Sequence, residues 1–469
     1  MNRRHFLKNS FASSLGLASI GAGVGSSVFL DAIFNTADGA IAPGGDDFKT
    51  LVVVNLNGGN DSLNMLIPTA DTEHAQYFNA RPSIAFKQSQ LRQLNDSNGT
   101  HNGFGVGPRM SGVQDLFNNG HLSFVANVGS LVEPLTKAQF LARNRAIPEG
   151  LGGHNTQAAY WQADHSNRIN TTRDGWGGRL ANEFMIDSTL PTNLSIGAGR
   201  NILQSHQQQS FYNLGVTGLR SLRDFEVGNV QPGISARRKA INALNELAIK
   251  SSDPFQQHAG ELFKDGLSLN QVLQTELANV PDLSSRFSPN QGSSGVAFSS
   301  NLANAAAMIL TRRQLGMKRQ ILFVEHADYD THTDHAERHG NTSEDLSTFL
   351  SEFNQIMVDE GVHDSVVTVT TSEFGRNLVS NGNGNDHGWG AQHMVMGGPV
   401  EGGQIFGTFP SLELDGDDDV NGSGRMLPTL SITQYGATLA RWFGVPDNRM
   451  ASVFPNIDNF GNRYIDFIT

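Results

Sequence analysis

A strand–helix–strand pattern in the last third of the chain most restricts how these 469 residues can fold. Residues 319–326 (RQILFVEH) and 365–371 (SVVTVTT) are apolar runs typical of buried strands. Between them, apolar residues recur at helical spacing over 343–361: Leu346, Phe349, Leu350, Phe353, Ile356 and Met357. Two strands joined by a covering helix form a βαβ unit, in which the strands run parallel. The pattern therefore predicts an α/β fold.

Further apolar runs extend this architecture. Residues 51–56 (LVVVNL), 121–129 (HLSFVANVG) and 393–398 (HMVMGG) each predict another buried strand. Residues 427–445 predict an amphipathic helix that closes the fold. Helical patterns fill residues 205–300, so we expect a helical insertion or cap there. The expected fold is a mostly parallel sheet sandwiched between helices.

The composition excludes several kinds of function. The net charge is -12 and no long Lys/Arg cluster interrupts it, which argues against a nucleic-acid partner. The chain has no cysteine, so disulfides, thiolate metal sites and cysteine nucleophiles are excluded. Any metal must be held by histidine, carboxylate, carbonyl or water.

The N-terminus has the features of an export signal. It reads MNRRHFLKNS and continues into a weakly apolar run over 11–30 that is rich in Gly, Ala and Ser. This pattern predicts a twin-arginine signal peptide over residues 1–42 and a periplasmic or secreted protein over 43–469. An uncleaved membrane anchor is the alternative. We expect no stable membrane span in the mature form.

Four polar stretches follow predicted strands. They are NLNGGNDS (55–62), EHADYDTHTDH (325–335), SEFGRN (372–377) and NGNGNDHGWGAQH (381–393). Ligands bind beyond the carboxyl ends of parallel strands, so these stretches should converge at one edge. The candidate metal ligands are Asp61, Asp330, His332, Glu373, Asp386 and His387. Mixed His and carboxylate ligands predict one or two divalent ions, with Zn or Mn favoured.

Each candidate also has a structural interpretation. Asp330 and His332 could simply form loop hydrogen bonds, and Glu373 could pair with Arg376 instead of binding metal. Arg376 could alternatively grip a phosphate or sulfate bidentately. His154, His393 and Asn57 are further cleft candidates, although His393 begins a predicted strand and could be a core residue.

The chain resembles the domain-of-unknown-function 1501 family within the alkaline-phosphatase and sulfatase-like superfamily. The stretches that carry the resemblance are VVVNLNGGNDSLNMLIP (52–68), GGHNTQAAYWQ (152–162), GWGGRLANEF (175–184), DYDTH (328–332), TTSEFGRN (370–377), DHGWGAQHMVMGGPVEGG (386–403) and MLPTLSITQYGATLARWFG (426–444). Together they span nearly all of the mature chain. By this resemblance, Asp330 and His332 match an Asp-and-His metal pair, and His387, with Asp386, matches the last metal-binding histidine.

Three positions depart from the superfamily's pattern. Glu373 stands where relatives carry the first residue of an Asp-His pair, and Phe374 replaces the His. Asn57 stands where an Asp ligand is usual. Ser62 is the nearest candidate for the usual Ser or Thr nucleophile. These departures put a complete two-metal site in doubt, so one ion and two ions both stay open.

The leading expectation is an exported, metal-dependent hydrolase of phosphate or sulfate esters. In it, a metal-activated water or Ser62 attacks, and Arg376 binds the anion of the ester substrate. The alternative is a catalytically degenerate relative that binds a polyanion, a glycan or a partner protein without turnover. A structural role in an exported assembly is a third possibility. The sequence does not fix the oligomeric state.

Overall fold

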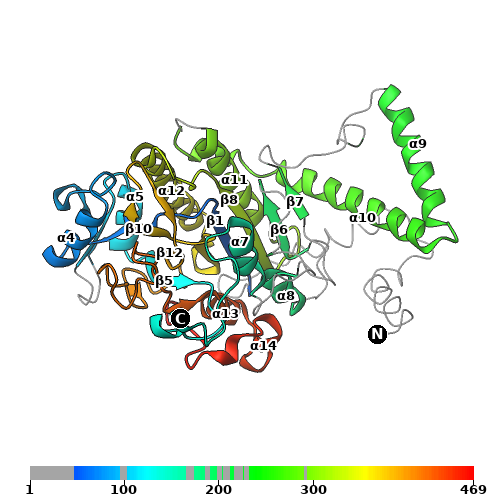
Figure 1. The fold of residues 1–469 in the computed structure, drawn as a ribbon. Helices are drawn as coiled ribbons and strands as arrows, with labels where there is room; N and C mark the ends of the chain where they lie inside the picture. Colours follow the sequence, from blue (N-terminus) through cyan, green and yellow to red (C-terminus); the bar gives the residue numbers. More distant parts are fainter. Residues whose placement is uncertain are drawn as a thin grey trace.

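The computed structural model describes residues 47–95, 103–164, 174–184, 191–197, 203, 212–215, 225, 232–289 and 293–468 (Figure 1). The predicted signal peptide, 1–42, lies outside these residues and stays a prediction. Among the described residues, no helix is both long and apolar enough to cross a membrane.

A nine-stranded sheet forms the centre of the molecule. Its strands are β1 (Lys49–Leu56), β5 (Leu122–Gly129), β6 (Asn193–Ile196), β7 (Tyr212–Leu214), β8 (Arg319–His326), β9 (Val366–Thr371), β12 (Ala391–Met396), β13 (Ile405–Phe406) and β14 (Leu430–Ser431). The order is β13-β5-β12-β9-β1-β8-β6-β7, and β14 pairs with β5. All neighbours run parallel except β12, which is antiparallel to both β5 and β9. The predicted α/β class with a mostly parallel sheet is confirmed.

The predicted βαβ unit is present. β8 leads into α12 (His335–Asp359), which returns the chain to β9, and β1 lies between the two strands. The helix begins at His335, eight residues before the periodic stretch 343–361 starts. The extra turns hold His335 and His339, which are buried. Their side chains are polar, and apolar periodicity therefore could not reveal that this part of the helix faces the interior.

Helices cover both faces of the sheet (Figure 1). Along β1, Val52 and Val54 point into one hydrophobic core, whereas Leu51 and Val53 point into another, as the two-residue period of a strand requires. The first core is closed by α5 (Ser111–Asn118), α11 (Ser293–Leu310) and α12. The second is closed by α7 (His154–Ala163), α8 (Trp176–Asn182), α13 (Ile432–Phe443) and α14 (Met450–Val453). The strands are apolar on both sides because both sides are covered.

Smaller elements complete the chain. They are a three-stranded sheet of β2 (Leu66–Pro68), β4 (Phe104–Val106) and β3 (Arg92–Gln93), the helices α4 (Asp71–Ala80) and α6 (Lys137–Ala142), and a hairpin of β10 (Arg376–Ser380) and β11 (Asn385–His387). Two long helices, α9 (Pro232–Ile249) and α10 (Pro254–Leu277), stand out from the body (Figure 1). Both lie within the range 205–300.

Candidate metal centre

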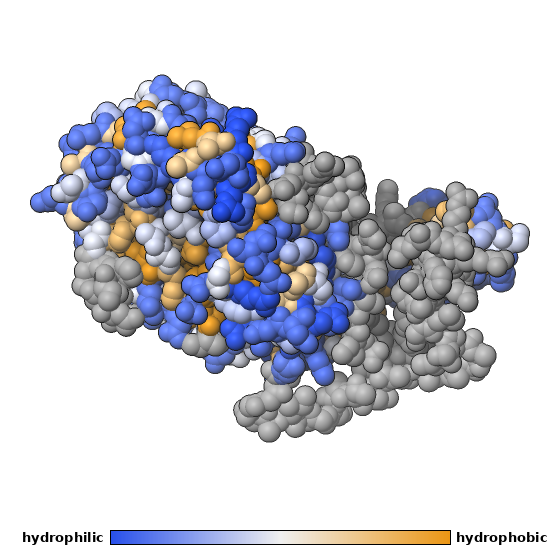
Figure 2. Space-filling model, turned by 60° about the horizontal axis from the view of Figure 1, so that its bottom comes forward, coloured by the Kyte–Doolittle hydropathy of each residue, from blue (hydrophilic) through white to orange (hydrophobic). Residues whose placement is uncertain are grey.

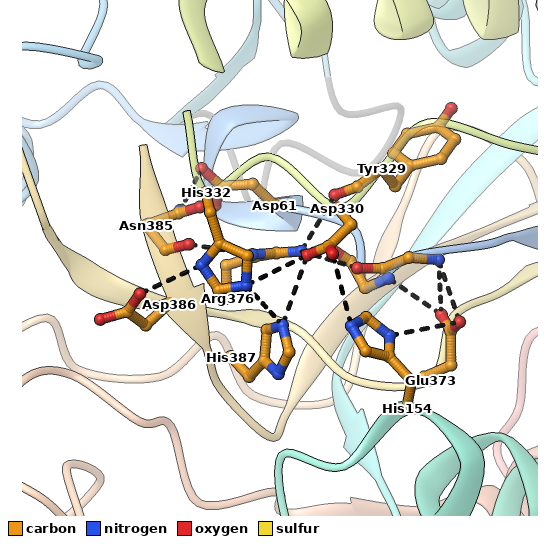
Figure 3. A network of polar contacts seen from close by, with 12 residues as sticks. Asp61, His154, Tyr329, Asp330, His332, Glu373, Arg376, Asn385, Asp386 and His387 are labelled. Atoms are coloured by element: carbon orange, nitrogen blue, oxygen red, sulfur yellow. Dashed lines mark hydrogen bonds and ion pairs between the residues drawn. The ribbon is translucent and has the colours of Figure 1, made fainter. Parts of the chain in front are cut away.

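Loops from the carboxyl ends of β1, β8 and β9 meet at one edge of the sheet. The turn after β1 contains Gly58 and Gly59, both with positive φ. A Cβ on Gly58 would lie 2.4 Å from the Asp330 amide nitrogen, and one on Gly59 would lie 2.1 Å from the Phe374 ring. Only glycine allows the loops to approach so closely. The β10–β11 hairpin then carries His387 to the same edge (Figure 3).

Three side chains from separate elements converge there. Ligand atoms of His154, Asp330 and His387 all lie within 4.8 Å of one another. His387 Nε2 is 3.3 Å from Asp330 Oδ1, and His154 Nε2 is 3.6 Å from Asp330 Oδ2. Figure 3 shows the two imidazoles pointing at this carboxylate from α7 and from the end of β11. Among the described residues, this is the one group of His and carboxylate side chains with metal-binding spacing.

His332 extends the cluster on its exposed side (Figure 3). Its Nε2 lies 2.8 Å from His387 Nε2 and 3.2 Å from Asp330 Oδ1, and its Nδ1 lies 3.2 Å from Asp386 Oδ1. The structure thus brings together four of the predicted metal residues, namely Asp330, His332, Asp386 and His387, and adds His154. Asp386 touches His332 on the side away from the other three.

The distances from the Asp330 oxygens to the imidazole nitrogens fit ligands of a small divalent ion, whereas His332 Nε2 and His387 Nε2, 2.8 Å apart, are closer than two ligands of one tetrahedral ion. Ligands at roughly 2.0–2.2 Å from a tetrahedral ion are separated by about 3.3–3.6 Å. The Asp330 oxygens lie 3.2, 3.3 and 3.6 Å from nitrogens of His332, His387 and His154, respectively. The donor set of His154, Asp330 and His387, two imidazoles and one carboxylate, suits a divalent transition metal.

One contact with a backbone carbonyl orients the imidazole of His387, and one contact with a carboxylate orients that of His154. His387 Nδ1 is 2.6 Å from the Gly152 carbonyl oxygen, and it must donate its proton there, which leaves the Nε2 lone pair facing the cluster. Burial lowers the pKa of His387, which favours the neutral ring that binds metal. His154 Nδ1 is 3.8 Å from Glu373 Oε1, and this interaction raises the pKa of His154.

Glu373 is fixed from its other side by the glycine turn. Its carboxylate accepts bonds from the Gly58 amide at 2.9 and 3.1 Å and from the Gly59 amide at 2.9 Å. The side chain is buried, and it is not one of the three clustered ligands. Glu373 therefore contacts His154 at Nδ1 and fixes the orientation of its ring. The sequence predicted that Glu373 lies at this edge of the sheet, but it could not show that the amides of Gly58 and Gly59 bind its oxygens.

Arg376 holds the loops together. Its guanidinium is 0% exposed and donates to the carbonyl oxygens of Gly59 at 2.8 Å, Asn385 at 2.9 Å and Gly58 at 2.7 Å. Nη2 also pairs with Asp330 Oδ1. Burial acts to raise the pKa of Asp330, but the hydrogen bond and charge of Arg376 outweigh it and keep the pKa below its usual value. The structure brings Arg376 to the site as a buried support for Asp330, without an exposed donor for an anion.

The remaining candidates lie apart from the clustered ligands. Asp61 is fully buried, with Arg81 Nη1 at 2.8 Å, His335 Nε2 at 2.8 Å and Asn385 Nδ2 at 2.8 Å from its Oδ2. Burial acts to raise the pKa of Asp61, and the charge of Arg81 and the bond from His335 lower it far more. The same oxygen thus already has three partners. Nothing in the sequence around Arg81 indicated this buried ion pair.

Ser62, His393 and Asn57 are likewise outside the cluster. Ser62 is buried, and its Oγ accepts a bond from the Gln392 amide at 2.9 Å. His393 is buried between the rings of Trp161 and Tyr435, with centroids 4.9 and 5.8 Å away, as expected of a core histidine. Asn57 is exposed at the end of β1.

Arg425 was missed by sequence reasoning. Its Nη2 donates to the His387 carbonyl oxygen at 3.2 Å, and burial lowers the pKa of its guanidinium. Within the described part of the chain, no carboxylate lies within ion-pair distance of it. A lone Arg in an acidic loop, DGDDDVNGSGR, gave no signal of this placement.

A family model described as "Protein of unknown function (DUF1501)" matches residues 48–432. The chain belongs to the DUF1501 family. This membership confirms the family part of the resemblance and specifies no activity. A comparison with curated proteins finds no match for this DUF1501 chain.

Solved structures show low similarity to the DUF1501 chain. The lipoteichoic acid synthase LtaP from Listeria monocytogenes is 10% identical, with 86% of this chain and 80% of that chain covered and a TM-score of 0.32. The PsFucS1 sulfatase from Pseudoalteromonas sp. is 10% identical, with 86% and 68% covered and a TM-score of 0.34. An alkaline phosphatase PafA mutant is 11% identical, with 72% and 64% covered and a TM-score of 0.27. TM-scores this low do not indicate a shared function.

Proposed function

We propose that this protein is an exported, metal-dependent hydrolase of phosphate or sulfate esters. The observation that carries the proposal is the convergence of His154, Asp330 and His387, from three separate elements, at the carboxyl edge of the sheet. Export by the twin-arginine route rests on residues 1–42 alone. The proposed substrate is an anionic ester, and a polyanionic glycan would satisfy the same chemistry.

In this proposal His154, Asp330 and His387 would hold one divalent ion, Zn or Mn, with His332 beside them. The ion would supply Lewis-acid polarisation of the ester and positive charge for its anionic group. One ion is favoured over two because Asp61, which would serve a second ion, already binds Arg81, His335 and Asn385.

The surrounding residues then have positioning roles. Arg376 fixes Asp330, Glu373 fixes His154 and the Gly152 carbonyl fixes His387. We assign the anion-binding role to Arg425 in place of Arg376. Arg425 is anchored on His387 and has no carboxylate partner among the described residues, whereas the guanidinium of Arg376 is enclosed. Since Ser62 is buried, water is the proposed nucleophile.

Turnover of small chromogenic esters tests this function. We would assay p-nitrophenyl phosphate and p-nitrophenyl sulfate with Zn or Mn, comparing wild type with Asp330→Asn and His387→Gln. We expect either variant to lose about 100-fold or more in kcat/KM, because each removes a ligand of the ion. Matched controls are Asp364→Asn, whose side chain is 98% exposed before β9, and His258→Gln, exposed on α10. Equal activity in site variants and controls would reject the proposed site.

A second candidate is a binding protein without turnover. It is favoured by the placement of Ser62, whose hydroxyl is buried against the Gln392 amide and leaves no hydroxyl nucleophile from this position at the cluster. A metal-loaded wild type that binds sulfated oligosaccharide but hydrolyses neither ester would support this candidate over the hydrolase.

A further inference from the structure

Half of the exposed large hydrophobic side chains in the described part of the chain lie on the two projecting helices. Among the described residues, eight large hydrophobic side chains are exposed, and four lie on α9 and α10: Leu244 (66%), Leu247 (67%), Phe255 (87%) and Leu262 (54%). On the face of the body shown in Figure 2, by contrast, hydrophobic residues form small patches separated by hydrophilic ones. Burying such side chains stabilises an association, so their concentration marks an interaction surface.

The exposed residues of α9 form a regular seam. Ala248 and Ile249 pack against α10, where a Cβ on Gly260 would lie 3.2 Å from Ala248 Cβ and 2.9 Å from Ile249 Cγ1. Among the described residues, nothing covers the opposite side of α9, whose side chains are exposed. This side carries a seam of exposed apolar residues at spacings of four, three and four: Ala236, Ala240, Ala243 and Leu247. Leu244, also exposed, lies at the margin of the seam. This is the a/d spacing of a helix that pairs with another helix.

The charges beside the seam identify the partner. We assign Ala240 and Leu247 to position a of the heptad abcdefg. The residues before them, Lys239 and Glu246, then occupy position g, and both are exposed. In an antiparallel pair, g positions of the two helices face each other. Two copies of α9 related by a two-fold axis therefore set Lys239 of each copy opposite Glu246 of the other. The seam is complementary to itself, as an isologous dimer interface must be.

We propose that α9 is a dimerisation arm that pairs antiparallel with α9 of a second copy of this chain. The seam has small alanines at three of its four positions, so the two helices can approach closely, and Leu247 and Leu244 supply most of the buried apolar surface. The contact is small compared with a standard protein interface, so we expect a weak, concentration-dependent dimer. The proposal is independent of the proposed hydrolase activity.

Sedimentation equilibrium of the purified protein tests it. Wild type should reach twice the mass of one chain as concentration rises. Leu244→Glu/Leu247→Glu should remain monomeric, because it places charges in the seam. The control Asn242→Glu/Ser268→Glu adds the same charge at exposed positions of α9 and α10 outside the seam and should dimerise like wild type. A wild type that is monomeric throughout, or a leucine variant that still dimerises, would overturn the proposal.

A charge exchange tests the antiparallel arrangement itself. Lys239→Glu alone sets like charges opposite each other twice in the dimer, and so does Glu246→Lys alone; each should weaken the dimer roughly tenfold. An equimolar mixture of the two variants restores both opposite-charge pairs and should form a heterodimer with wild-type affinity. If mixing does not restore association, the antiparallel register is wrong. If the protein stays monomeric and binds anionic lipid vesicles through Leu244 and Leu247, the partner of the seam is a membrane surface and not a second copy.

Discussion

At the residue scale, the site depends on side chains that hold others in place. Glu373 and Arg376 lie three residues apart in the chain: Glu373 fixes His154, and Arg376 fixes Asp330. Both are buried: the sequence suggested Glu373 as a metal ligand and Arg376 as the group that binds the anion, whereas in the structure both bind backbone groups of the glycine turn. Sequence position therefore predicted that they belong to the site, and only the fold reveals that the backbone of Gly58 and Gly59 is their common partner.

Replacing Glu373 by Gln should weaken metal binding by about 10-fold to 100-fold, the usual effect of losing a group that orients a metal ligand. The amide would also set an N–H donor against the Gly58 and Gly59 amides, so the free energy of unfolding should fall by roughly 1–3 kcal/mol. Titration with Zn while monitoring metal-dependent thermal stability measures both effects. A variant with wild-type affinity would show that His154 needs no support from Glu373.

Asp164 gives the protein a pH-dependent stability. It is buried, and its Oδ1 accepts a hydrogen bond from Thr433 Oγ1 at 2.5 Å. Burial raises the pKa of its carboxyl to about 7. The unfolded chain loses this proton near pH 4, whereas the folded protein keeps it to about pH 7. The contribution is thus fully present below about pH 4 and is lost as the pH rises through 7.

Asp164→Asn should remove this dependence. For wild type, the Asp164 contribution lowers the free energy of unfolding by roughly 1.4 kcal/mol for each pH unit between about 4 and 7. The amide cannot ionise, so the variant should be more stable than wild type at pH 8 and should match it near pH 4. Urea unfolding at both pH values makes the comparison, with the exposed Asp364→Asn as control. A constant difference at both pH values would contradict the assignment.

At the element scale, the turn after β1 decides how closely the site loops can meet. Gly59 has φ +80°, and a Cβ there would lie 2.1 Å from the Phe374 ring. The turn also supplies the amides that bind Glu373 and the carbonyls that bind Arg376. One short glycine turn therefore positions the supports of both His154 and Asp330.

Gly59→Ala should lower the free energy of unfolding by about 3 kcal/mol or more, since it adds a steric overlap to an unfavourable backbone angle. Gly120→Ala is the matched control: Gly120 has φ +75°, but a Cβ there meets nothing within 4 Å. The control should lose only about 1–2 kcal/mol. Chemical denaturation of both variants measures the difference. Similar losses would mean that the Phe374 ring moves aside at little cost.

The helices and strands of the sheet were largely predictable from the sequence, but the hydrogen bonds and ion pairs between buried polar side chains were not. The β8–α12–β9 unit followed from apolar periodicity, because burial on both sides of the sheet demands it. Parallel strands then fixed which loops meet, which is why Asp330, His332 and His387 were correctly expected to lie together. The Asp61–Arg81 pair joins two polar residues of different loops, and no periodic pattern records such a contact.

At the scale of the whole molecule, one sheet edge collects loops that are hundreds of residues apart in sequence. His154, Asp330 and His387 are fixed by α7, by the loop after β8 and by the β10–β11 hairpin, so metal binding would tie these three parts together. An ion that binds the folded state alone stabilises it by mass action. We expect added Zn or Mn to raise the melting temperature of wild type, and chelator to lower it again.

Metal content measured by elemental mass spectrometry shows directly whether His154, Asp330 and His387 hold an ion. Protein purified without chelator or nickel resin would be compared with Asp330→Ala/His387→Ala and with the exposed control Asp364→Ala/His258→Ala. We predict close to one Zn or Mn ion per chain in wild type and control, and almost none in the site variant. A correctly folded wild type that contains no metal, and takes up none when Zn or Mn is supplied, would contradict this prediction.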